Sequence, residues 1–122
     1  MSIAIDINGE CVTVRDVRRN EHQLVFVLAA PLLAELRDCF VRHDGPPPLA
    51  MVLVITDKHR NAWHALLARC SGRSVDWIAG LSDADATRLG LAFFAAGVRF
   101  WRLVGSKDLR HFLAPRSDAL FA

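Results

Sequence analysis

The stretch from Leu81 to Val104 is the strongest folding signal in the chain. Ser82 stands before two aspartates, and such a serine caps a helix N-terminus while the acids complement the helix dipole. Gly97 suits the end of this helix, because glycine adopts the left-handed conformation without steric cost. Between them, one apolar stripe recurs at helical spacing and comprises Ala86, Leu89 and Phe93. These signals predict a helix between Ser82 and Gly97.

The N-terminal residues predict a β-hairpin. Isoleucines at positions 3, 5 and 7 alternate with Ala4 and Asp6, as in a strand with one apolar face. Asn8-Gly9 follows, and both residues tolerate the positive φ angles of a tight hairpin turn. Residues 11–14 form the return strand. Residues 15–22 are mostly polar and are predicted to extend the hairpin and turn the chain.

Three later runs rich in apolar and branched residues predict further strands. They are Leu24–Leu28, Met51–Ile55 and Val98–Val104. Between the first two, leucines and aromatics recur at helical spacing after Pro31, which suits the first turn of a helix. The prolines at positions 46–48 end that helix.

Residues 61–72 leave two alternatives open. They suit a helix that is capped by Asn61, stopped by Gly72 and supported by alanine and leucine propensity. They equally suit a strand that pairs with Met51–Ile55 through a polar loop and turns again into Ser74–Ala79. We favour strands, because the loop resembles a hairpin turn. A short helix is also predicted near Lys107–Leu113.

The order of these elements predicts an α+β fold. We expect residues 1–122 to form a single domain with a mainly antiparallel sheet of about five or six strands and two main helices packed on it. No apolar run approaches the ~18 residues of a membrane span, and the first residues lack a secretory signal. We therefore expect a cytoplasmic protein, and the arginine-rich composition suggests a GC-rich bacterial genome.

No residue pattern indicates catalysis, a metal site or a cofactor. The three cysteines are widely spaced and are expected to be buried, reduced thiols. Phosphate-binding glycine loops and nucleophile-elbow motifs are absent from the sequence. The polar groups that an enzyme or a small-ligand site would use are His59, His64 and Cys70, in a pocket between sheet and helices.

The C-terminal third is the one region with an uneven charge distribution. The whole chain has a formal net charge of only +2, yet cations dominate from Arg99 to Arg116, where Asp108 is the single acid. Aromatic residues are interleaved with these cations. On a strand, Arg99 and Trp101 would share one face and give a basic patch with an aromatic anchor. The predicted binding residues are Arg99, Trp101, Arg102, Lys107 and Arg110.

The sequence therefore favours a non-catalytic protein that binds another protein, with an acidic one suited to the basic patch. A small regulator, an adaptor or a toxin-neutralising immunity-type protein would fit, and a homo-oligomer is compatible with the sequence. The main alternative is the small-ligand or enzymatic domain described above. A third interpretation is weak nucleic-acid binding through the basic C-terminal third. No membrane association is expected.

Overall fold

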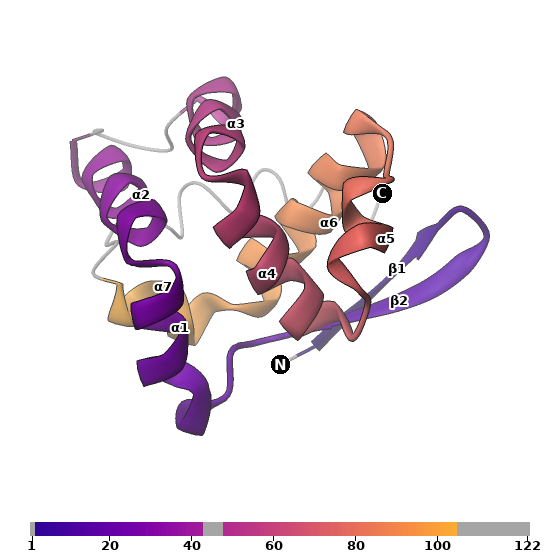
Figure 1. Cartoon of the computed structure of the whole chain (residues 1–122), viewed down its shortest axis with the longest axis horizontal. Coiled ribbons are helices and arrows are strands. Elements are labelled where there is room, and N and C mark those ends of the chain that lie inside the picture. The colour runs from indigo at the N-terminus through magenta and orange to yellow at the C-terminus, as the bar shows by residue number, and fades with distance from the viewer. Residues whose placement is uncertain (1, 43–47, 105–122) are drawn as a thin grey trace.

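The computed structural model describes residues 2–42 and 48–104, and this part of the chain is mostly helical (Figure 1). Helices account for 71% of the described residues, and the only sheet among them is a two-stranded antiparallel hairpin. The predicted α+β fold with five or six strands and two main helices is therefore wrong. The elements are β1 (Ser2–Ile7), β2 (Glu10–Arg15), η1 (Arg19–Glu21), α1 (His22–Leu28), α2 (Ala30–Arg42), α3 (Leu49–Lys58), α4 (Arg60–Ser71), α5 (Val75–Ala79), α6 (Asp83–Ala96) and α7 (Val98–Leu103).

The N-terminal hairpin is confirmed. Strands β1 and β2 pair antiparallel, with Ile5 opposite Val12, and Asn8 and Gly9 both have positive φ, 55° and 78°. The isoleucine face of β1 is buried together with the valine face of β2. Helices α4 and α6 pack against this hairpin, which lies along one side of the helices in Figure 1.

The central helix α6 is also confirmed. The Ser82 hydroxyl accepts a hydrogen bond from the Asp85 amide at 3.2 Å, as a helix N-cap does. Gly97 ends the helix with φ of −91°, so it is not in the left-handed conformation that we expected. A Cβ atom at Gly97 would lie 2.9 Å from the Phe93 carbonyl oxygen and 3.3 Å from Trp101 Nε1. Close packing, rather than a positive φ, requires glycine there.

The three apolar runs predicted as strands are helical. Leu24–Leu28 forms most of α1, Met51–Ile55 lies inside α3, and Val98–Val104 forms α7 and the residue after it. Burial follows helical spacing: Val25, Ala29 and Leu32 are buried, whereas the intervening apolar side chains of α1 are exposed. These runs are thus not covered on both faces, as a central strand would be.

Residues 61–72 adopt the helical alternative, so the strand that we favoured there is wrong. Helix α4 ends at Gly72, which has φ of +71° and a left-handed conformation that favours glycine. The predicted strand Ser74–Ala79 is also wrong, because the Ser74 hydroxyl accepts from the Trp77 amide at 3.0 Å and caps α5. The short helix predicted near Lys107–Leu113 lies outside the described residues.

An aromatic cluster forms the centre of the core, where α4, α6 and α7 meet. Trp101 lies with its ring centroid 4.8 Å from that of Phe94 and 5.7 Å from that of Phe93. Trp63 packs 5.6 Å from both phenylalanines. Helix α7 is therefore anchored in the core by its aromatic side chains. None of the described helices has the length and apolar character needed to cross a lipid bilayer.

Candidate functional site

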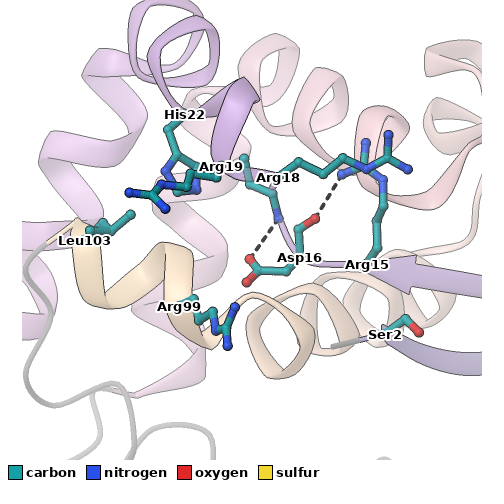
Figure 2. A pocket seen from close by; sticks show the side chains of 9 residues that line it. Ser2, Arg15, Asp16, Arg18, Arg19, His22, Arg99 and Leu103 are labelled. Atoms are coloured by element: carbon teal, nitrogen blue, oxygen red, sulfur yellow. Dashed lines mark hydrogen bonds between the residues drawn. The ribbon is translucent and has the colours of Figure 1, made fainter.

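A positively charged hollow lies between the segment that follows β2 and helix α7 (Figure 2). It has a volume of about 920 Å³ and is open to solvent. Residues from the 15–22 segment line one side, and Arg99 and Leu103 of α7 line the other. We call this site the basic hollow; its lining residues are Ser2, Arg15, Asp16, Val17, Arg18, Arg19, His22, Arg99 and Leu103.

Local hydrogen bonds shape the 15–22 segment. The Val17 amide donates to Asp16 Oδ1 at 2.8 Å, and the Arg18 amide donates to Glu21 Oε1 at 3.0 Å. Val17 itself is buried in the core and anchors the turn. The chain then enters η1 and α1, so that Arg18, Arg19 and His22 border the hollow.

One carboxylate of this segment, that of Glu21, accepts hydrogen bonds from two arginines. Arg15 makes two hydrogen bonds to Glu21, at 2.8 and 3.2 Å, and Arg69 of α4 reaches the same carboxylate at 2.8 Å. Arg15 also donates to the Arg69 carbonyl oxygen at 3.1 Å. The hydrogen bond from Arg15 is the main reason why the pKa of Glu21 falls to about 2. We call these three residues the Glu21 cluster; they join the hairpin to α4.

Asp16 lies at the junction of the hollow and α7. Its Oδ1 is 3.4 Å from the position that a Cβ atom would occupy on Gly97, the residue before α7. Partial burial raises the pKa of Asp16, and the amides of Val17 and Phe100 together with His22 partly offset this rise. The carboxylate therefore faces the first turn of α7, where backbone N–H groups lack helical acceptors.

The remaining cations of the basic hollow have no acidic partner within the described part of the chain. Arg18, Arg19 and Arg99 are exposed and form no ion pair there. The lining contains four arginines and one aspartate, a formal charge of +3 with His22 neutral. Such a concave lining with a net positive charge attracts anions and acidic surfaces.

The structure redistributes the predicted binding residues. Arg99 lines the basic hollow, but Trp101 has no exposed surface and cannot serve as the surface anchor that we expected. Its Nε1 is buried and has no hydrogen-bond partner among the described residues. Arg102 lies on α7 with its side chain outside the described part, and Lys107 and Arg110 lie outside the described residues.

Sequence reasoning missed the partners that join Arg99. Arg15, Arg18, Arg19 and His22 lie within eight consecutive residues that contain only two acids. That local excess of cations was the available signal. It could not be connected to Arg99, because the contact depends on how α7 packs against the hairpin.

The polar groups considered for an enzyme or ligand site lie apart. His59 Nε2 is 2.9 Å from Glu35 Oε1, near the junction of α3 and α4. His64 lines a different hollow, of about 440 Å³, between α3, α4, α5 and α6, and burial lowers the pKa of His64. Cys70 is buried in the core, and burial raises its pKa to about 12. No group of three metal-ligating side chains occurs among the described residues.

The expectation of three buried cysteines is only partly correct. Cys39 and Cys70 are buried, but Cys11 is exposed on β2. Cys11 takes part in the backbone pairing with Asp6, and its side chain points to the solvent face of the hairpin. A two-stranded sheet with one covered face leaves alternate residues in water.

Large apolar side chains are exposed mainly on two helices. Helix α1 carries four of them and α3 carries three, and α5 and α7 carry one each in the described residues. Neighbouring exposed apolar residues of this kind are typical of surfaces that bind other proteins. They are Leu24, Phe26, Val27, Leu28, Met51, Leu53, Val54, Val75 and Leu103.

Comparisons with known proteins identify a family but no function. No curated protein and no solved structure matches the chain. A family model described as a family of unknown function (DUF6631) matches residues 2–112. This match covers most of the chain and includes both sides of the basic hollow. The chain therefore belongs to the DUF6631 family.

Proposed function

We propose that this protein is a non-catalytic binding protein that recognises an acidic partner protein through the basic hollow. The observation that supports the proposal most directly is the lining, in which Arg18, Arg19 and Arg99 face solvent without an acidic partner in the described residues. Complementary charge across an interface speeds encounter and rejects partners of the wrong sign. A small regulator, an adaptor or an immunity-type protein would use such a surface.

A protein partner explains the surface better than nucleic acid does. Binding to phosphate backbones favours strongly basic chains, whereas this chain has a formal net charge of +2. The exposed apolar residues of α1 also favour a protein, since interface cores combine arginine with large apolar side chains. The free, exposed thiol of Cys11 is compatible with a reducing compartment, and we propose that the protein acts in the cytoplasm.

The proposal is tested by titrating the protein with poly-L-glutamate and, separately, with a single-stranded oligonucleotide, each at low and at high salt. We expect poly-L-glutamate to bind at low salt and to weaken as salt screens the arginines. The double variant Arg18→Gln, Arg99→Gln should weaken this binding about tenfold or more, since each lost contact to a carboxylate is worth roughly 1 kcal/mol. The matched control Arg37→Gln removes an exposed arginine of α2, away from the hollow, and should bind normally.

Two results would contradict the proposal. Poly-L-glutamate affinity that does not respond to the Arg18 and Arg99 substitutions would remove the basic hollow as the site. Tighter binding of the oligonucleotide, with a steep loss of affinity on a log-log salt plot, would favour the nucleic-acid interpretation instead.

A further inference from the structure

We infer that the partner segment carries a large apolar side chain beside its acidic residues, and that Leu103 and Phe26 receive this side chain next to the arginines. This inference rests on the proposed function and specifies the chemistry of the partner. We call Leu103 and Phe26 the apolar ledge. Leu103 lines the basic hollow from α7, and Phe26 of α1 lies beside His22, which also lines the hollow.

The two ledge residues are exposed although they adjoin the core. Leu103 lines the basic hollow with 58% of its surface exposed, and Phe26 has 36% exposed. The Phe26 ring lies 5.6 Å from the ring of Phe100, which is one helical turn before Leu103 on α7. Phe26 therefore contacts a buried residue of α7 that lies one turn away from Leu103 on the same helix.

His22 joins the ledge to the charged part of the hollow. Its ring lies 6.0 Å from that of Phe100 and 6.4 Å from that of Phe26, and it also lines the hollow. In Figure 2, Leu103 of α7 lies at the same end of the hollow as Arg19 and His22 of the facing segment. The apolar and cationic groups thus form one continuous surface.

The base of the ledge is buried and packed in the aromatic core. Phe100 has no exposed surface and packs 5.1 Å from Trp101, which is itself completely buried. Phe26 packs on this buried base through the contact between its ring and that of Phe100. Binding to a preorganised surface loses less conformational entropy than binding to a mobile one.

The composition of the surface restricts the ligand. A ligand with carboxylates alone would pair with the arginines and leave Leu103 in water. An apolar ligand would cover Leu103 and remove the arginines from water without a counter-charge, which is unfavourable. A segment that combines carboxylates with a leucine-sized side chain satisfies both, as interfaces with a buried apolar centre and a charged rim do.

Two synthetic peptides of equal length and equal net charge test this inference. The first intersperses glutamate with alanine, and the second has one central alanine replaced by leucine. By fluorescence anisotropy at low salt, we expect the leucine peptide to bind roughly five- to tenfold more tightly, because a partly exposed apolar site becomes covered. Leu103→Ala should abolish this preference, so that this variant binds the leucine peptide and the alanine peptide with equal affinity.

The matched control is Val54→Ala, which truncates a side chain with 67% exposure on α3. This variant should retain the full preference for the leucine peptide. Loss of the preference in Val54→Ala but not in Leu103→Ala would overturn the inference and place the apolar contact on α3. Both variants change exposed residues, and equal thermal melts would show that each folds as the wild type does.

The outcomes also separate this inference from the proposed function. If both peptides bind equally and both respond to salt and to Arg99→Gln, the basic hollow binds acidic segments and only the apolar ledge is refuted. If neither peptide binds, the proposed function fails together with the inference. A leucine preference that disappears in Leu103→Ala supports both.

Discussion

Two sets of arginines border the same short segment of chain, and they differ in their partners. In the Glu21 cluster, Arg15 and Arg69 share one carboxylate whose side chain is only 13% exposed. In the basic hollow, Arg18, Arg19 and Arg99 face water and have no acidic partner within the described residues. Arginines of the first set are thus suited to stabilising the fold, and arginines of the second set are suited to binding a partner.

The Glu21 cluster also orients the arginines of the hollow. Glu21 accepts from the Arg18 amide, so the carboxylate that joins Arg15 to Arg69 also fixes the turn on which Arg18 and Arg19 lie. A binding surface that depends on unpaired charges needs such support, because like charges repel each other and favour a loosened loop. The paired arginines allow the unpaired ones to remain close together.

The largest effect is expected for Glu21→Ala. This change leaves two neighbouring guanidinium groups without a carboxylate and the Arg18 amide without an acceptor, and should cost about 3 kcal/mol of unfolding free energy. The matched control is Glu10→Ala, because the side chain of Glu10 is 53% exposed and its one ion pair within residues 2–42 and 48–104 is with Arg73, at 3.3 Å. This change should cost less than about 1 kcal/mol. Equal losses in urea melts would refute the distinction between clustered and surface arginines.

Acid should remove the stabilisation that the Glu21 carboxylate gives to the fold. The pKa of Glu21 is about 2 in the folded protein against an ordinary value of 4.5, so ionised Glu21 stabilises the fold above pH 4.5 and this stabilisation is lost as pH falls towards 2. By a pH of about 3 the loss should reach on the order of 2 kcal/mol. Urea melts of wild type and Glu21→Gln should therefore converge at low pH; a constant difference down to about pH 2 would show that Glu21 acts without its charge.

Elements marked by specific turn or capping residues were predicted correctly from the sequence, whereas elements inferred only from apolar runs were not. Asn8-Gly9 specifies a tight turn, and Ser82 caps the helix that follows it, so the hairpin and α6 were predicted correctly from neighbouring residues. The runs that became α1, α3 and α7 contain exposed apolar residues such as Val27 and Val54, which hide the helical period. Unbroken apolar runs were therefore mistaken for buried strands.

Only one side of the candidate site was predicted from the sequence, because the two sides are far apart along the chain. Arg99 was identified from local charge, but its pairing with the 15–22 segment arises from a contact between residues about 80 positions apart, which no periodicity encodes. Trp101 was misplaced because a strand would put it on the face of Arg99, whereas on α7 adjacent residues point in different directions. The helical turn sends Trp101 into the core and leaves Arg99 in solvent.

A smaller effect on stability is expected for Asp16→Asn. This variant tests whether the carboxylate of Asp16 stabilises the fold as that of Glu21 does. Burial raises the pKa of Asp16, so its ionised form contributes no stability at neutral pH, and the neutral amide should change the unfolding free energy by less than about 1 kcal/mol. The asparagine oxygen can still accept from the Val17 amide. With one negative charge removed, poly-L-glutamate should bind a few-fold more tightly; destabilisation as large as that of Glu21→Ala would show that Asp16 is a structural ion-pair partner.

The smallest effect on stability is expected for Arg99→Gln. Arg99 is exposed at the first turn of α7 and forms no ion pair among the described residues, so its removal should change the unfolding free energy by less than about 0.5 kcal/mol. A cation near a helix N-terminus is even slightly unfavourable to the helix dipole, so a small gain in stability is consistent with this position. The same variant should weaken poly-L-glutamate binding clearly. Arg69→Gln should show the opposite pattern, with a larger loss of stability and a smaller loss of binding. Urea melts and binding titrations on these two variants compare the arginine sets directly, and a stability loss in Arg99→Gln equal to that in Arg69→Gln would show that both sets hold the fold together.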